Sequence, residues 1–226
     1  MSQRAVPADY AVQFHRPKPL EHAHPALVLI DLQRASASRH HGLGAALQRQ
    51  GRASEGAWRF DRIEELVLPN VQRLLASARA RHHPVFHVAL GSRSVAFDDV
   101  PPYLRPIVEA SDNRVGAPAH AFLELVRPQA GEMVITKATA DAFIDTPFDR
   151  ELHRAGVDTL IVAGVSTNSC VESTVRHAAD LGYAVVLAED ACAAASAGLH
   201  EAAVRNLARF FVDVASTSDI LRTITS

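Results

Sequence analysis

The chain contains few of the residues that mark disulfide-rich, fibrous or membrane-spanning proteins. Of its 226 residues, two are cysteine, one is tryptophan, eleven are glycine and twelve are proline. This composition excludes collagen-like, low-complexity and disulfide-scaffold proteins, and two thiols in a reducing compartment are more often free than bridged. The longest apolar runs, such as residues 160–165, have the length of a strand and fall far short of the ~20 residues that span a bilayer.

An excess of charge of either sign is also missing. Lys and Arg number 23 against 25 Asp and Glu, which gives a formal net charge of −2. This balance provides no electrostatic reason to expect a nucleic acid or an anionic membrane as partner. The first 19 residues carry scattered charges and no apolar stretch of the kind found in secretory signals. We therefore predict a cytoplasmic protein.

The length and the pattern of apolar runs predict one α/β domain over residues 1–226, with residues 1–24 as an N-terminal extension. Short apolar runs alternate with helix-length amphipathic stretches, which is typical of βαβ units. Most of these runs are apolar throughout, as expected for parallel strands covered on both faces. The predicted strands are residues 26–30, 85–90, 133–136, 159–164, 184–188 and, more weakly, 211–214.

The helical predictions rest on apolar periodicity and on end signals. A long helix is expected over residues 61–81, with a kink at Pro69. Gly156 and Gly182 follow two further helices, and Ser218 is a candidate N-cap for the last one. These remaining helices cover residues 148–155, 171–181, 196–209 and 219–223. Residues 34–58 and 91–113 resist assignment, and long connections of this kind are often functional.

Three reactive side chains stand at the carboxyl ends of predicted strands, namely Asp31, Lys137 and Cys170. Ligands of open parallel sheets bind at that edge. The nucleophilic form of cysteine is the thiolate, which the N-terminus of the following helix and the Lys137 cation would both favour. Asp31 would accept the thiol proton and return it to a leaving amine, and the backbone amides of Ser166 and Cys170 would hold an oxyanion.

Each of these residues also has an ordinary structural interpretation. A cysteine after an apolar strand is usually a small buried hydrophobe, an aspartate at a strand end is often a cap, and a lysine in a loop is usually solvated. Residue types and spacing alone therefore do not decide between a triad of Asp31, Lys137 and Cys170 and separate structural roles for the three residues.

Three ordered motifs favour the triad, because they resemble those of the isochorismatase-like cysteine hydrolases. Residues 164–183, GVSTNSCVESTVRHAADLGY, resemble the nucleophile segment of this family. Residues 26–33, ALVLIDLQ, resemble its first strand with an Asp-x-Gln ending, and residues 137–143, KATADAF, followed by Thr146, resemble its lysine motif. The resemblance extends over residues 26–219.

The resemblance implies a Rossmann-like, three-layer fold with a six-stranded parallel sheet in the order 3-2-1-4-5-6 and helices on both faces. It places the family's Asp, Lys and Cys at Asp31, Lys137 and Cys170, and its cis peptide bond between Val165 and Ser166. Strands 1 and 4 are neighbours in this order, whereas Lys137 ends strand 3, about 10 Å from strand 1 by ordinary strand spacing. The residues after Lys137 must therefore turn inward. The resemblance also implies a homodimer or a homotetramer.

Members of the family differ in their reactions. Isochorismatases proper lack the thiol, so Cys170 argues against that reaction. Nicotinamidases add a metal held by an Asp-x-His pair and a further histidine; here His40 and His41 have no carboxylate nearby, and His87 is expected in the core. We therefore predict no metal or other cofactor, and an enzyme that cleaves a carbamoyl or simple amide C–N bond with release of ammonia, like the N-carbamoylsarcosine, ureidoacrylate and biuret amidohydrolases.

Three alternatives stay open. One is a nicotinamidase-like amidase, and another is a non-catalytic binding or assembly member of the fold. The third is a thiol enzyme of redox type, in which Cys192 would be the second cysteine. Its spacing from Cys170 is unlike a Cys-x-x-Cys motif and favours a structural role.

The predicted substrate is a small amide or ureide, recognised by side chains near the motifs. The candidates are Gln33, Trp58, Phe143 and Thr167. An arginine would suit a substrate carboxylate, because its planar fork binds one bidentately. The arginines placed for that role are Arg34, Arg59 and Arg93.

Overall fold

The computed structural model describes residues 10–14, 16, 23–209 and 211–224, and all six predicted strands lie within them. They form one sheet in the order β3-β2-β1-β4-β5-β6, in which every neighbouring pair is parallel, as the resemblance implied. The strands are β1 (Pro25–Ile30), β2 (Val85–Leu90), β3 (Met133–Lys137), β4 (Thr159–Val165), β5 (Ala184–Ala193) and β6 (Asp213–Ala215). The order in which the chain adds strands to the sheet reverses between β1 and β4, and in open parallel sheets ligands bind at the carboxyl ends of the strands at such a switch point.

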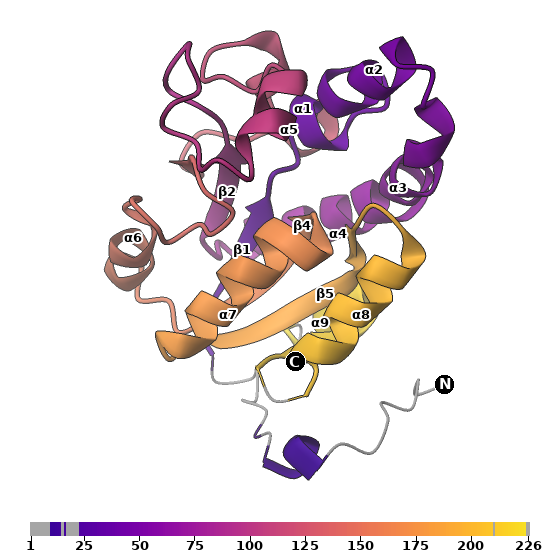
Figure 1. Cartoon of the computed structure of the whole chain (residues 1–226). Helices are drawn as coiled ribbons and strands as arrows, with labels where there is room; N and C mark the ends of the chain where they lie inside the picture. The colour runs from indigo at the N-terminus through magenta and orange to yellow at the C-terminus, as the bar shows by residue number, and fades with distance from the viewer. Residues whose placement is uncertain (1–9, 15, 17–22, 210, 225–226) are drawn as a thin grey trace.

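Helices cover both faces of the sheet, which gives the three layers visible in Figure 1. One face packs against α6 (Phe148–Arg154), α7 (Glu172–Asp180) and α8 (Ala197–Leu207), and α5 (Arg105–Ala110) adds Val108 to the same core from the carboxyl edge. The other packs against α3 (Ala57–Arg62), α4 (Leu68–Ala80) and α9 (Thr217–Thr223). Because both faces are covered, the central strands β1, β2 and β4 are buried along their whole length.

The long helix predicted over residues 61–81 begins earlier and has a π-helical segment within it. Helix α3 leads into a π-helix over Ile63–Val67, and α4 follows directly. The amide of Leu68 bonds the carbonyl of Ile63, five residues back. Pro69 then stands in the first turn of α4, where its missing N–H is tolerated. The structure therefore has a π-helical segment just before the proline, and the kink at Pro69 itself stays a prediction.

Three other boundaries differ from the sequence prediction. Strand β5 runs on to Ala193 through the polar pair Glu189 and Asp190, which hid its length. Strand β6 is a short edge strand that begins two residues late. The cap of α9 is Ser216, not Ser218, because the Ser216 hydroxyl accepts a bond from the amide of Asp219 at 3.1 Å.

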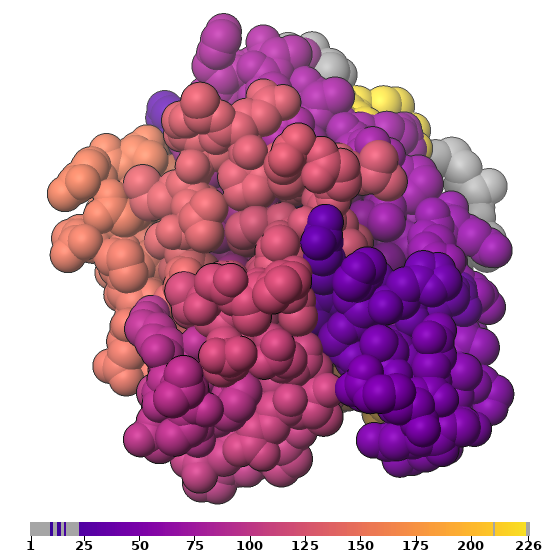
Figure 2. Space-filling model, turned by 90° about the horizontal axis from the view of Figure 1, so that it is seen from above, coloured from indigo at the N-terminus to yellow at the C-terminus, as the bar shows by residue number. Residues whose placement is uncertain are grey.

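The two unassigned segments lie over the carboxyl edge of the sheet. The first contains α1 (Arg34–Ala37), α2 (Gly42–Arg49) and a 3-10 turn at Ala53–Gly56; the second contains α5 and leads to 3-10 turns at Pro118–His120 and Glu124–Val126. Backbone bonds tie them together, from Arg34 to the carbonyl of Ala121 and from Leu123 to that of Leu32. Figure 2, seen from above, shows these segments side by side with a notch between part of the first and part of the second.

No helix among the described residues is both long and apolar enough to cross a membrane. Most of the predicted N-terminal extension, residues 1–24, lies outside the described part of the chain. Within it the structure describes only a 3-10 turn at Tyr10–Phe14 and three further residues. The division of the chain into one domain and this extension stays a prediction.

Candidate active site

Asp31 follows β1 directly and is held in place by its neighbours. It is 2% exposed and adopts a left-handed backbone conformation with φ 52°. The amide of Leu90, at the end of β2, donates to its Oδ1 at 2.9 Å, and the Ser36 hydroxyl donates to its backbone carbonyl. A carboxylate has about four acceptor positions, so Asp31 can still take a proton from a neighbouring group.

Lys137 reaches Asp31 across the end of β2. It is the last residue of β3, opposite Leu90 in the sheet, and its ammonium lies 3.0 Å from Oδ2 of Asp31 and 3.0 Å from the carbonyl of Thr139. The side chain is fully buried. Burial alone would lower the pKa of Lys137, but the charges of Asp31 and Cys170 outweigh it and raise that pKa. Lys137 is therefore a permanent cation at this site.

The segment after Lys137 turns inward, as predicted. Ala140, Ala142 and Phe143 are buried in the core beneath α7. The amide of Ala142 donates to the hydroxyl of Thr174 at 3.1 Å, which fixes this crossing to α7.

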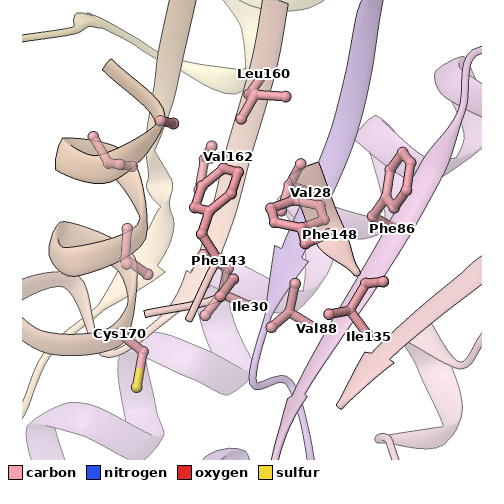
Figure 3. Close-up of a cluster of buried hydrophobic side chains, with 14 of the residues drawn as sticks. Val28, Ile30, Phe86, Val88, Ile135, Phe143, Phe148, Leu160, Val162 and Cys170 are labelled. Atoms are coloured by element: carbon pink, nitrogen blue, oxygen red, sulfur yellow. The ribbon is translucent and has the colours of Figure 1, made fainter. Parts of the chain in front are cut away.

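Cys170 lies in a π-helical turn, Thr167–Val171, that begins the helix continuing as α7. It is 6% exposed, and Figure 3 shows its sulfur pointing away from the apolar side chains of the core, near the carboxyl ends of the strands. Burial and the charge of Asp31 raise the pKa of the Cys170 thiol to about 12, although Lys137 opposes them. At neutral pH the thiol is therefore protonated, and a proton must leave during the attack.

The turn before Cys170 has an unusual backbone. The peptide bond between Val165 and Ser166 is cis, as the resemblance implied. The amides of Ser169 and Val171 both donate to the carbonyl of Ser166. Among the described residues, no acceptor pairs with the amide of Ser166 itself. An amide without an acceptor is what an oxyanion hole requires, so the predicted role of Ser166 stays open to test.

Arg59 is the one of the three candidate arginines that lies inside this site. It is 5% exposed; it donates to the carbonyl of Ser36 through Nη2 and Nε at 2.8 and 3.2 Å, and to the Ser166 hydroxyl at 2.7 Å. Burial lowers its pKa to about 10, while Cys170 and Asp31 act in the opposite direction. Arg93, by contrast, is exposed and donates to the carbonyl of Thr136, and Arg34 is half-buried.

Gln33 and His120 present unpaired polar atoms close to Asp31. The amide nitrogen of Gln33 donates to the carbonyl of His120 at 2.8 Å, which leaves its buried Oε1 without a partner. Nε2 of His120 is likewise buried and unpaired in the described part of the chain. Burial lowers the pKa of His120, and the charge of Asp31 opposes this. Its ring lies over Gly91, where a Cβ would come within 2.5 Å of it.

Sequence reasoning missed His120, because it lies beyond the unassigned segment 91–113 and no local pattern singles it out. It also missed His200. Nδ1 of His200 is 2.9 Å from the hydroxyl of Thr167, and its Nε2 is 3.0 Å from the guanidinium of Arg62. Since Arg62 can only donate, Nε2 of His200 accepts and Nδ1 carries the proton.

The other substrate-binding candidates have structural partners. Thr167 is fully buried and its hydroxyl is used by His200. Phe143 packs in the core against the rings of Phe148 and Tyr183. Trp58 is half-buried, with its ring 6.2 Å from that of His200. Of the four candidates, Gln33 alone offers an unpaired polar atom near Asp31.

No group of three or more metal-ligating side chains occurs within the described ranges. His87 is buried and lies 2.9 Å from the carboxylate of Glu132, so it is a hydrogen-bonded core histidine as expected. A cavity of about 250 Å³ opens at the opposite, amino-terminal edge of the sheet, between β2, β3 and α6. It contains none of the candidate residues and has no part in the site.

A buried cysteine thus lies beside an aspartate–lysine pair at the switch point of a doubly wound sheet, which is the arrangement expected of a nucleophilic α/β enzyme. The sequence model of the Isochorismatase domain matches residues 25–219, so the chain belongs to that family.

Three relatives illustrate the match. The chain is 30% identical to a ureidoacrylate amidohydrolase of Methylobacterium radiotolerans, over 87% of this chain and 78% of that protein. It is 28% identical to a maleamate amidohydrolase of Pseudomonas putida, over 88% and 85%. The crystal structure of an isochorismatase family protein from Desulfovibrio vulgaris superposes with a TM-score of 0.74 at 25% identity, over 91% of this chain and all of that one.

Proposed function

We propose that this protein is an amidohydrolase that uses Cys170 to cleave a carbamoyl or simple amide C–N bond of a small molecule, with release of ammonia. The observation that carries the proposal is the buried contact of Lys137 with Asp31 beside the Cys170 thiol. Family membership and relatives named as ureidoacrylate and maleamate amidohydrolases support the same chemistry.

The first half of the reaction forms a thioester or a thiocarbamate. The Asp31 carboxylate takes the Cys170 proton as the sulfur attacks the carbonyl carbon, and the carbonyl electrons move to its oxygen. When the tetrahedral intermediate collapses, the C–N bond breaks and Asp31 returns the proton to the departing nitrogen, which leaves as ammonia. Because the pKa of Cys170 is raised to about 12, this coupling of proton transfer to attack avoids the need for a free thiolate.

The second half releases the acid. Water attacks the acyl carbon while Asp31 accepts its proton, and the C–S bond breaks to regenerate the thiol. The amides of Ser166 and Cys170 stabilise the oxyanion in both halves, a contribution of about 3 kcal/mol per donor in comparable enzymes. Lys137 stabilises negative charge on sulfur and orients the carboxylate of Asp31 through the 3.0 Å bond to Oδ2.

Gln33 is the substrate-binding residue that we favour. Its unpaired Oε1 is an acceptor in the buried site, and the N–H of an amide or ureide would satisfy it. This scheme uses no metal or other cofactor, and the chain would act on an amide or ureide as a homodimer or homotetramer in the cytoplasm.

The test is ammonia release from ureido acids, biuret, nicotinamide and simple amides, with the wild type beside Cys170→Ala and in the presence of a chelator. We expect one class to be hydrolysed, the Cys170→Ala variant to be inactive and the chelator to have no effect. Loss of activity with the chelator would favour the nicotinamidase-like alternative. Absence of any turnover, or activity that survives in Cys170→Ala, would overturn the proposed mechanism.

A further inference from the structure

The buried site carries one positive charge that no described side chain neutralises. Lys137 pairs with Asp31, and the Cys170 thiol and His120 are neutral at pH 7, because burial raises the pKa of the first and lowers that of the second. Arg59 is the remaining charged group. No carboxylate of the described chain pairs with it, and its three hydrogen bonds go to a carbonyl and a hydroxyl.

An uncompensated guanidinium is costly inside a protein. Burial of a charge is normally offset by a counter-ion, and loss of one partner from a buried pair is strongly destabilising. Arg59 is as buried as the catalytic candidates, yet its neighbours supply only neutral acceptors. A guanidinium has five N–H donors, and the bonds to Ser36 and Ser166 engage three of them. Two donors therefore remain without an acceptor among the described residues.

The position of Arg59 points to the substrate as that ligand. It bridges Ser36, whose hydroxyl bonds the backbone of Asp31, and Ser166, whose amide is a candidate oxyanion donor. Lys137 approaches Asp31 from β3, whereas Arg59 approaches from α3 and bonds residues that follow β1 and β4. Arg59 is thus close enough to Cys170 and Asp31 for both to act on its pKa, yet it takes no part in the Lys137–Asp31 pair.

We infer that Arg59 binds an anionic group of the substrate, so that the site selects amides or ureides that carry a carboxylate. This inference rests on the proposed function for the identity of the bond that is cleaved. The carboxylate completes the charge balance of the closed site, and the planar fork of arginine matches its two oxygens. The unpaired Oε1 of Gln33 complements this arrangement, because it takes an N–H group and cannot take an anion.

Alkylation of Cys170 by iodoacetate and iodoacetamide tests the inference without knowledge of the natural substrate. In each reaction the sulfur forms a bond to carbon, the C–I bond breaks, and iodide and the thiol proton leave. The two reagents differ in charge, so the ratio of their rates, followed on the Cys170 peptide by mass spectrometry, reports an anion site. Charge-assisted bonds lead us to expect the ratio to fall about 10-fold or more in Arg59→Met.

Two other variants separate binding from folding. Arg59→Lys keeps the charge and loses the fork, so its ratio should lie between those of the wild type and Arg59→Met. Arg39→Met removes a half-buried arginine that pairs with Asp61 and Glu64 outside the site, and should leave the ratio unchanged. The iodoacetamide rate shows in every variant that the thiol is still accessible and reactive.

Hydrolysis of succinamate and of its neutral analogue succinamide provides the second arm. The wild type should prefer succinamate, and Arg59→Met should lose that preference. The inference would be overturned if the alkylation ratio stayed unchanged in Arg59→Met, or if both alkylation rates and both hydrolysis rates fell by the same factor. Arg59 would then support the thiol and not bind an anion. A fall in the ratio without hydrolysis of any amide by the wild type would leave the anion site standing and contradict the proposed function instead.

Discussion

The reactivity of Cys170 depends on two neighbours with opposite effects. Asp31 raises the pKa of the thiol through its negative charge, and Lys137 lowers it. The same carboxylate is the proposed base that removes the proton. Asp31 therefore makes the resting thiol less acidic while making attack on a bound substrate possible.

The Asp31→Asn variant should separate the effect of Asp31 on the thiol pKa from its proposed role as the base. We expect the pH midpoint of Cys170 alkylation by iodoacetamide to move to lower pH, because a charge that raises the pKa is removed while Lys137 stays. Amide hydrolysis should fall by about 10²–10⁴, the usual contribution of general acid–base catalysis. Alkylation followed on the Cys170 peptide and ammonia release measure the two quantities. A midpoint that rises, or hydrolysis that persists, would contradict the assigned role.

The buried Lys137–Asp31 pair should dominate the stability of the site. Lys137→Met leaves Asp31 buried without its cation, and we expect a loss of about 3–5 kcal/mol in the free energy of unfolding, measured by urea denaturation. The double variant Asp31→Asn with Lys137→Met removes both charges and should be more stable than the single variant. If the two substitutions destabilise additively, the residues do not act as a pair.

At the residue scale the sequence predicted the positions of Asp31, Lys137 and Cys170 better than those of the polar residues around them. Asp31, Lys137 and Cys170 stand at strand ends, where topology alone brings them to one edge. Arg59 could be named as a candidate but not chosen over Arg34 and Arg93, because burial of one arginine depends on contacts with Ser36 and Ser166. His120 could not be found, since its position follows from the fold of the loop over Gly91.

At the scale of elements, the close approach of β4 to β1 sets the position of the turn Thr167–Val171, which carries Cys170. Gly164 pairs with Ile30 in the sheet and has φ 125°, and a Cβ there would lie 2.1 Å from the Ile30 carbonyl oxygen. The ladder between β4 and β5 also shifts register between Val162 and Gly164. A side chain at this position would force β4 away from β1, together with the turn that carries Cys170.

Gly164→Ala should therefore be severely destabilising, by more than about 3 kcal/mol, or prevent folding. Gly198→Ala is the matched control, because Gly198 is exposed in the first turn of α8 with no atom within 4 Å of an added Cβ. That substitution should be neutral or stabilise by up to about 1 kcal/mol. Thermal unfolding of both variants checks this, and similar melting temperatures for the two would show that the β1–β4 contact tolerates a side chain.

A carboxylate beside the edge strand β3 makes the stability of the protein sensitive to acid. Glu132, just before β3, accepts bonds from Arg79 at 2.7 Å and from the amide of Gln129 at 2.8 Å, and lies 2.9 Å from His87. Burial by itself raises the pKa of Glu132, but Arg79, the Gln129 amide and His87 outweigh it and lower that pKa to about 2. Because the folded-state pKa is below the ordinary value, the stabilisation is present above about pH 4.5 and is lost as the pH falls toward 2.

Glu132→Gln should remove about 2–3 kcal/mol of stability at pH 7 and flatten the dependence of stability on pH between 5 and 2. Glu124→Gln is the control, since Glu124 forms an exposed ion pair with Arg127, a type of contact that contributes little. Urea denaturation at several pH values measures both. A variant that keeps the wild-type slope would show that other carboxylates control the acid response.

At the scale of the whole molecule, the strand order explains why three distant segments form one site. The apolar runs predicted the strands, but no periodicity in them fixes the order of strands in the sheet. The motif resemblance supplied that order, and the structure confirms it. The cover formed by residues 34–58 and 91–126 was beyond local reasoning, because its short helices are held by long-range bonds such as that from Arg34 to Ala121.

In the proposed reaction Cys170 forms a covalent intermediate during hydrolysis of an amide. Intact-protein mass spectrometry of the enzyme quenched during turnover tests it most directly. We predict an adduct equal to the substrate minus ammonia, located on the peptide that contains Cys170 and absent from Cys170→Ala. Turnover without any adduct, in an enzyme whose Cys170→Ala variant remains active, would contradict the account.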